Sequence, residues 1–340
     1  MLTNIETNRK AFVLILVLIV VSAMTTIVVA AVYRTKIAVR LAHANSQRTK
    51  AYYLAIGGIE RIKALLASQE LAVEWVGQVS KFTSDAVSEG LFAEPSAANQ
   101  DMNMSLSYCV RDELAYFNIN NSDPACWENI PGISVEIRSC ISDWIDEDDD
   151  TNPSGAENDY YQRLDQPYSC KNNPATKLKE LCYVKNISFD MYRGQYANPG
   201  NEMLSLHENQ SNDNSVLTLT DIFTVYGDGK VNINTASSTI LSALPGLDSQ
   251  TINTILNYRT GSDAKAGTDD DNYIKSAESL SGIEGLTELQ IELLSQYCCF
   301  ISGFFRIYSS AEVQKNRCVL MSTIEITQNG LKIVSAERLL

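Results

Sequence analysis

The longest apolar run in the chain lies close to its start. Residues 12–33 read FVLILVLIVVSAMTTIVVAAVY and carry no charge. A helix of this length extends over roughly 30 Å, the thickness of the hydrocarbon core of a bilayer. The run predicts a transmembrane helix, and Arg9 and Lys10 just before it place the N-terminus in the cytoplasm by the positive-inside rule. A cleaved secretory signal peptide is the alternative, although its apolar core is normally only about 7 to 15 residues long.

Helical spacing continues beyond this run. Residues 34–68 contain no proline, and apolar residues recur in them at roughly helical intervals. These residues are Ile37, Leu41, Ala44, Tyr52, Leu54, Ile59 and Ile62. We expect the membrane helix to run on into solvent as one long rod, with a bend at Gly57 and Gly58, because paired glycines weaken a helix.

Alternating patterns appear at two places far apart in the chain. Residues 105–112 and 115–121 predict two short strands, and residues 304–313, 316–327 and 330–340 predict three more. Most segments between about 125 and 297 have helical spacing instead, and the Ser- and Ala-rich residues 71–105 read as a linker or loop. The predicted fold is α+β: an antiparallel sheet packed on the N-terminal rod and interrupted by a large helical insertion.

The insertion contains a pattern of two helices joined by a tight turn, in residues 231–262. Thr235 or Ser237 can cap the first helix, Pro245 and Gly246 make the turn, and Ser249 opens the second helix. In DNA-binding forms of such a helix-hairpin-helix, the turn brings backbone N–H groups to a phosphate. Asp248 stands in this turn and would repel phosphate, so structural packing is favoured over nucleic-acid binding.

Charge and composition restrict the chemistry. The 340 residues carry a formal net charge of -14, which argues against nucleic acid and anionic lipid as partners of the chain as a whole. Only two histidines are present, His43 and His207, and they are far apart in the sequence. Histidine-based catalysis or zinc ligation is therefore disfavoured, and a metal site would have to be built from oxygen.

The cysteines indicate an oxidising compartment. All 8 follow the apolar run and none forms a CxxC pair. Cys170 and Cys182 flank a short loop, which favours a local disulfide between them, whereas Cys298 and Cys299 are expected to bond to two different partners. Free buried thiols are the alternative.

One stretch is densely acidic. Residues 143–161, DWIDEDDDTNPSGAENDYY, contain eight carboxylates and no lysine or arginine. A twelve-residue calcium loop takes oxygen ligands from alternate positions and a glutamate at the last one. Counted from the first aspartate of IDEDDD, the candidate ligands are Asp146, Asp148, Asp150, Asn152, Ser154 and Glu157. Thr151 replaces the turn glycine of the usual loop, so this would be a variant calcium site. A solvated acidic loop is the alternative.

These features together resemble a known family. The basic leader before FVLILVLIVV, the DWIDEDDD and GAENDYY segments, the YGDGKVNINTAS segment and the LSGIEGLTELQIELLSQY helix resemble type II secretion protein K, a minor pseudopilin. The resemblance implies a prepilin leader that prepilin peptidase cuts after Ala11, with N-methylation of the new first residue, Phe12. It also implies that the inserted domain binds calcium.

Leu16 departs from the common pattern of pilin-like subunits. Their fifth mature residue is usually a glutamate, which pairs with the N-terminal amine of the neighbouring subunit inside the membrane. Leu16 occupies that position here, a departure that protein K shares. A subunit without this glutamate suits the tip of a filament better than its shaft.

The resemblance implies a non-enzymatic structural protein. Anchored in the bacterial inner membrane by a single span, with its bulk in the periplasm, it would cap the tip of the periplasmic pseudopilus. It would also help to initiate assembly of the pseudopilus and so support export of folded proteins through the outer membrane. The implied partners are the minor pseudopilins I and J, possibly H, the major pseudopilin, the inner-membrane assembly platform and prepilin peptidase, with secreted cargo and the secretin as further candidates. The expected divisions are a leader (1–11), a transmembrane helix (12–33), its periplasmic continuation (34–70), the first part of a pilin-like head (71–124), an inserted helical domain (125–297) and C-terminal strands (298–340).

Two other classes of function stay open. One is a minor subunit of a type IV pilus or DNA-uptake filament that would use the helix-hairpin-helix. The other is a membrane-anchored periplasmic hydrolase with a metal held by the acidic stretch. The hydrolase lacks a plausible partner base, because His43 lies on the rod near the membrane and His207 lies in a polar loop.

Overall fold

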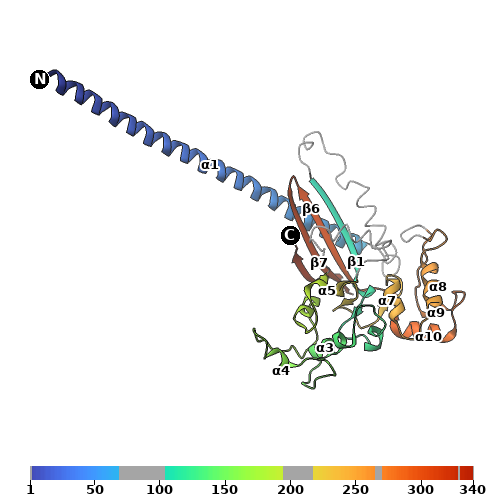
Figure 1. The fold of residues 1–340 in the computed structure, drawn as a ribbon. Coiled ribbons are helices and arrows are strands. Elements are labelled where there is room, and N and C mark those ends of the chain that lie inside the picture. Colours follow the sequence, from blue (N-terminus) through green and yellow to red (C-terminus); the bar gives the residue numbers. More distant parts are fainter. Residues whose placement is uncertain (1, 69–103, 194–216, 265–269, 328–329, 340) are drawn as a thin grey trace.

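A single long helix leads into the folded part of the protein. The computed structural model describes residues 2–68, 104–193, 217–264, 270–327 and 330–339. Helix α1 (Leu2–Ser68) projects far from the rest of the molecule at its N-terminal end and packs against a sheet at its C-terminal end (Figure 1). At about 1.5 Å per residue, this helix is roughly 100 Å long. The continuous rod expected from the sequence is thus present.

The first half of α1 is apolar and uncovered. An 18-residue window of it has a mean hydropathy of 3.0 and none of that window is buried. By length and composition this is the one helix among the described residues that could cross a membrane. Ala11 and Phe12 lie within α1, but their side chains are outside the described part of the structure.

Four antiparallel strands form the main sheet, in the order β1-β6-β7-β8. The strands are β1 (Met104–Asp112), β6 (Phe304–Val313), β7 (Asn316–Thr327) and β8 (Gly330–Arg338). The first strand therefore pairs with a strand from the far end of the chain, with Cys109 opposite Tyr308. The predicted α+β class is confirmed, with its antiparallel sheet and its long helical insertion between β1 and β6.

Helix α1 packs on this sheet through small residues and a few large ones. Ala51, Ala55, Ile59, Ile62 and Leu66 are buried against sheet residues such as Ile307 and Leu320. They recur every three or four residues and so form one helix face. A β-carbon on Gly58 would overlap the hydroxyl group of Ser309 in β6, so the close approach requires glycine there.

The two glycines of α1 do not end the helix, which continues through Gly57 and Gly58. The bend expected there stays a prediction. Of the apolar residues that recur at helical spacing, Ile59 and Ile62 are buried, whereas Ile37, Leu41 and Tyr52 are exposed. The sheet lies so close that alanine and glycine, which a hydrophobic pattern does not emphasise, carry much of the contact.

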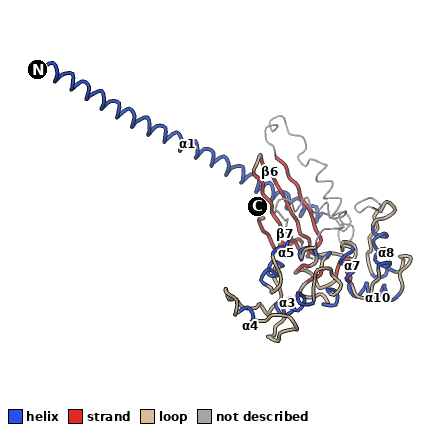
Figure 2. The backbone as a smooth tube through the Cα atoms, viewed as in Figure 1, coloured by secondary structure: helices blue, strands red, loops and turns tan. Residues whose placement is uncertain are grey.

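The segment between β1 and β6 forms a second core of its own, which we call the helical body. Figure 2 shows its helices and loops beside the strands of the main sheet. Its helices are α3 (Val135–Ile145), α4 (Asn158–Tyr161), α5 (Phe189–Arg193), α7 (Ser238–Ala243), α8 (Ser249–Arg259), α9 (Ala277–Leu280) and α10 (Glu288–Tyr297). Its 3-10 helices are η1 (Glu113–Ala115), η2 (Pro124–Trp127), η3 (Leu178–Tyr183) and η4 (Leu219–Asp221). Short parallel pairs join β2 (Phe117–Asn118) to β3 (Phe223–Thr224) and β4 (Val231–Asn232) to β5 (Cys298–Cys299).

Helices α7 and α8 occupy the segment in which a hairpin of helices is expected. Ser237 caps α7, and Gly246 in the turn has a φ of 77°, which glycine adopts freely. Asp248 caps α8, where its carboxylate accepts hydrogen bonds from the backbone N–H and the hydroxyl of Thr251 at 2.8 and 2.7 Å. The carboxylate thus serves the helix terminus, and it keeps a negative charge in the turn.

The helical body is joined to the sheet by buried charged groups at the end of β1. Asp112 accepts hydrogen bonds from Asn232 and Thr235 of the body at 2.8 and 2.6 Å. Glu113, fully buried, pairs with Arg306 of β6 at 2.8 Å and accepts a hydrogen bond from Thr224 at 2.7 Å. Burial raises the pKa of the Asp112 carboxyl. These contacts fix the body to the sheet on which α1 lies.

Candidate metal centre

The acidic stretch begins on a well-defined helix. Ser134 caps α3, and its hydroxyl accepts a hydrogen bond from the backbone N–H of Ile137 at 3.3 Å. Ile137, Ile141 and Trp144 bury one face of α3 in the core of the body. Asp143 lies next to this face, and Asp146 follows it by one helical turn at the end of the helix.

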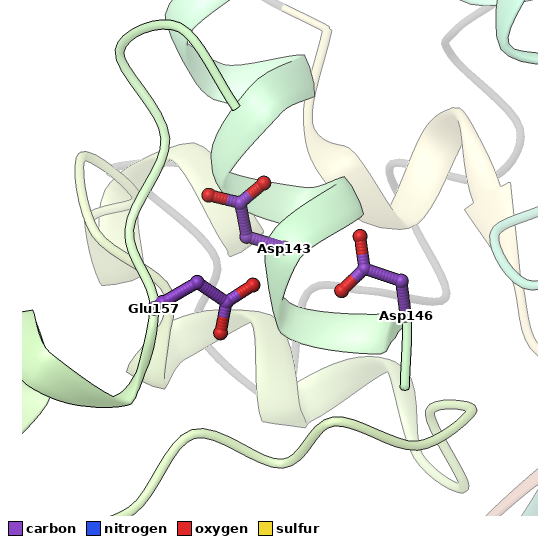
Figure 3. A group of neighbouring side chains, drawn as sticks. All are labelled: Asp143, Asp146 and Glu157. Atoms are coloured by element: carbon purple, nitrogen blue, oxygen red, sulfur yellow. The ribbon is translucent and has the colours of Figure 1, made fainter. Parts of the chain in front are cut away.

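Three carboxylates from two segments meet here. Asp143 and Asp146 come from α3 and its end, and Glu157 comes from the residue that precedes α4 (Figure 3). One oxygen atom of each lies within 4.8 Å of the others. Asp143 is 0% exposed and Glu157 is 3% exposed, so two of the three charges are removed from water. We call these three residues the carboxylate trio.

Most of the buried oxygens of the trio lack a hydrogen-bond donor among the described residues. They are Oδ2 of Asp143, Oδ1 of Asp146 and both carboxylate oxygens of Glu157. Buried carboxylates without a donor or a counter-charge are costly, and like charges at this separation repel each other. A bound cation or a shared proton would relieve both penalties.

The pKa values of Asp146 and Glu157 respond to this crowding. Burial, together with the charges of Asp148 and Asp143, raises the pKa of Asp146 to about 6. Burial and the charges of Asp143, Asp146 and Asp149 raise the pKa of Glu157 to about 7. In the absence of a cation, the protein therefore holds a proton here near neutral pH.

The segment that follows α3 folds back over Asp143. Asn152 donates hydrogen bonds from its backbone and side-chain N–H groups to Oδ1 of Asp143, at 3.2 and 2.6 Å. Gly155 passes so close that a β-carbon there would overlap the Asp143 carboxylate. Lys185 donates to the carbonyl oxygen of Gly155 at 2.9 Å and holds this segment in place. Asp143 is thus enclosed, with one oxygen hydrogen-bonded and the other free for a ligand.

The structure brings together two of the six ligands counted in the sequence, Asp146 and Glu157. Asp148 and Asp150 are exposed and lie outside the trio; Oδ1 of Asp148 accepts a hydrogen bond from the backbone N–H of Asp150 at 2.9 Å. The amide of Asn152 donates to Asp143, and Ser154 is exposed with a φ of 68°. The chain therefore does not follow the path of a twelve-residue calcium loop, because it turns back at Asn152 to cover α3.

Asp143 is the residue that counting along the loop missed. A signal for it exists in the sequence, since Asp143 and Asp146 are three residues apart in an amphipathic segment and so lie on the same face of a helix. Asp143 was not predicted as a ligand, because the twelve-residue loop was counted from Asp146.

The donor set suits a hard cation. With Oδ1 of Asp143 held by Asn152, the three carboxylates can provide up to about five oxygen atoms, and water could complete the about six to eight that calcium takes in flexible geometry. Magnesium requires a tighter octahedron and retains its waters. Asp143, Asp146 and Glu157 are therefore the residues that would hold calcium in this protein.

Two cysteines border the site. The thiol of Cys170 donates to the carbonyl oxygen of Asp143, and the thiol of Cys140 donates to that of Ser154, both at 3.5 Å. Cys170 and Cys182 are both free thiols in the structure, so the disulfide between them stays a prediction. Burial raises the pKa of Cys170 to about 11, which makes its thiol a poor metal ligand.

Comparisons with known proteins point to one family. The family model of type II secretion system protein K matches residues 132–194, which include Asp143, Asp146 and Glu157. A protein K of Pectobacterium carotovorum subsp. carotovorum is 38% identical over 58 residues, which are 17% of this chain and 18% of that protein. The crystal structure of the GspK-GspI-GspJ complex from the enterotoxigenic Escherichia coli type 2 secretion system contains a chain that is 14% identical, with a TM-score of 0.48 over 78% of this chain and 94% of that one. The resemblance of this chain to type II secretion system protein K is thereby confirmed.

Proposed function

We propose that this protein is a minor pseudopilin that occupies the tip of the periplasmic pseudopilus of a type II secretion system. It is a structural subunit, anchored in the inner membrane by α1, with its sheet and helical body in the periplasm. The observation that carries the proposal is the build of α1: an uncovered apolar half continues without a break into a half that packs on an antiparallel sheet. The match of residues 132–194 to protein K supports the same assignment.

The tip position is supported by Leu16. This residue lies in the uncovered apolar half of α1 and is 51% exposed. A glutamate at that depth in a membrane is tolerated when a neighbouring subunit supplies an amine for it. A subunit that lacks the glutamate makes no such demand, and so it can be the first one to enter a filament.

The helical body supports a terminal position in another way. It lies at the end of the molecule opposite to the N-terminus of α1 (Figure 1). In a filament whose subunits stand with α1 along the axis, a subunit placed above would meet this body. The body is therefore better accommodated where nothing follows. Its neighbours would be the minor pseudopilins of the I and J type, followed by H and the major pseudopilin.

Calcium fits this role as a structural ion. Bound by the carboxylate trio, it would fasten the end of α3 to the segment before α4 and so stabilise the helical body. The positive charge of the ion and the negative charges of the trio would compensate each other, and neither takes part in a reaction. The leader would be removed after Ala11, leaving Phe12 as the methylated first residue.

The assignment is tested in a strain that lacks its own copy of this protein. We expect the full chain to restore export of a folded secreted protein, and Leu16→Glu to allow the subunit into the shaft of purified pseudopili. Leu18→Glu is the matched control, since it places the same charge in the span at a position that meets no partner amine. Equal behaviour of the two glutamate variants would contradict the role given to Leu16.

A further inference from the structure

One section of α1 is basic, although the chain as a whole has a net negative charge. No carboxylate occurs between Glu6 and Glu60, whereas Arg34, Lys36, Arg40, Arg48 and Lys50 follow the apolar run. These five side chains are exposed, and none of them forms an ion pair with another described residue. Five cations that have no counter-charge in the part of the chain that the structure describes invite an anionic partner.

The positions of these cations along α1 divide them into two groups. Arg34, Lys36 and Arg40 lie within about 10 Å of the end of the apolar run along the helix axis. The polar headgroup layer of a bilayer is roughly 5 to 8 Å thick on each side, and long basic side chains extend further. Arg48 and Lys50 lie about 20 Å or more beyond Arg34, which places them past that layer.

The first group lies on two sides of the helix. At about 100° per residue, Lys36 and Arg40 point roughly 200° and 240° away from Arg34. A partner helix would contact one face of α1, whereas lipid headgroups surround it on all sides. Cations on two well-separated sides of α1, directly after an apolar span, therefore match headgroups better than they match a single protein neighbour.

We propose that Arg34, Lys36 and Arg40 bind the phosphate groups of anionic phospholipids in the leaflet where the apolar span ends. The guanidinium groups of Arg34 and Arg40 can each donate two parallel hydrogen bonds to a phosphate, and Lys36 adds a point charge. Tyr33, 65% exposed at the same level, has the amphipathic ring that is typical of this interface. The inference requires that residues 12–33 span a membrane, and it does not depend on the function proposed above.

Headgroup binding by Arg34, Lys36 and Arg40 also accounts for an unusual charge distribution. Two cations, Arg9 and Lys10, precede the span, and five follow it within the next seventeen residues. The positive-inside rule disfavours so many cations on the far side of a membrane, so their retention there calls for a compensating interaction. Anionic headgroups provide this compensating interaction without a second protein. They would also fix the depth and tilt of α1 in the membrane.

The test uses the full chain in phosphatidylcholine vesicles that contain a trace of spin-labelled phosphatidylglycerol or spin-labelled phosphatidylcholine. Electron paramagnetic resonance then measures the fraction of each labelled lipid held at the protein surface. We expect the protein at low salt to retain phosphatidylglycerol about threefold more strongly than phosphatidylcholine. This preference should shrink by at least half at about 0.5 M salt, because surface charges are screened.

A matched pair of variants locates the effect. Arg34→Gln with Lys36→Gln should remove most of the preference, and Arg48→Gln with Lys50→Gln should keep it. Both variants lose one arginine and one lysine from exposed positions of the same helix, and Arg9 and Lys10 remain in both. The proposal is overturned if the two variants lose the preference equally, if neither loses it, or if only the second does. The last result would instead place the headgroup contacts at Arg48 and Lys50.

Discussion

Gly58 of α1 lies directly against Ser309 of β6, so close that a methyl group on the glycine would overlap the serine hydroxyl. Gly57, its neighbour in the sequence, has open space among the described residues at the place where its β-carbon would be. The two adjacent glycines therefore have different roles, although the sequence presents them as one weak point in the helix. The contact at Gly58 sets how closely the membrane helix approaches the sheet.

Gly58→Ala should destabilise the protein by about 1 to 3 kcal/mol, because the added methyl group overpacks the contact between helix and sheet. Gly57→Ala is the control, and it should stabilise by up to about 1 kcal/mol through better helix propensity. Chemical denaturation of the detergent-solubilised chain measures both. Adding Ser309→Ala to Gly58→Ala should restore part of the loss, since the hydroxyl is the nearest obstacle. Equal effects of the two single alanine variants would contradict the packing described for Gly58.

Millimolar calcium should stabilise the helical body through the carboxylate trio. An ion at about 100 times its dissociation constant would add about 2.7 kcal/mol to the free energy of unfolding. Glu157→Gln and Asp143→Asn should each remove most of this gain, because they delete charge at the centre of the site. Calorimetric titration and thermal melting provide the measurement.

Asp150→Asn is the informative control for the calcium experiment. Asp150 is exposed and outside the trio, yet counting along the acidic stretch made it a ligand. The structure predicts that its substitution leaves calcium binding nearly unchanged. Loss of binding in Asp150→Asn with retention in Asp143→Asn would favour the twelve-residue loop over the arrangement described above.

The same site should make stability depend on pH in a direction set by its raised pKa values. When a chelator removes calcium, the folded protein holds protons on Asp146 and Glu157 more tightly than the unfolded chain does. The reason is that the pKa values of these two carboxyls in the folded protein are raised to about 6 and about 7. The protonated forms of Asp146 and Glu157 therefore stabilise the folded state most at low pH. This stabilisation is lost as the pH rises through about 6 to 7. Calcium competes with these protons, so the stabilisation by calcium should increase over the same interval. Glu157→Gln should flatten both trends in parallel denaturation series at several pH values, and an unchanged slope would contradict the coupling.

Loss of the buried ion pair between Glu113 and Arg306 should weaken the contact between the helical body and the sheet. Glu113→Gln leaves the Arg306 guanidinium buried without its counter-charge, at a cost of about 3 to 5 kcal/mol. Glu325→Gln is the control on the same sheet, because its pair with Lys332 spans 3.5 Å at the surface and should contribute less than about 1 kcal/mol. Limited proteolysis and denaturation curves compare the two variants. Similar losses in both would show that burial of the Glu113 pair does not matter.

Pattern alone predicts the elements of this fold well and their contacts less well. The strands at residues 304–313 and 316–327 were expected at the bounds observed for β6 and β7, because alternation and turn residues define them locally. The contact face of α1 escaped prediction, since it consists partly of Ala51, Ala55 and Gly58, whose small size is explained only by the sheet that lies against them.

The carboxylate trio shows the same limit. Asp146 and Glu157 were identified from composition and spacing, whereas Asp143 is recruited by the return of the chain over α3. That return depends on the close passage of Gly155 and on Lys185, which lies far from the acidic stretch in the sequence. A count of positions along a loop assumes the path of the loop, and here the path differs.

If this protein caps its filament, it lies at one end of the filament only. Immunogold labelling of the helical body on sheared pseudopili, viewed by electron microscopy, tests this most directly. We expect gold particles at one end of each labelled filament and none along the shaft. Particles distributed along the shaft of filaments that carry the unaltered protein would contradict it.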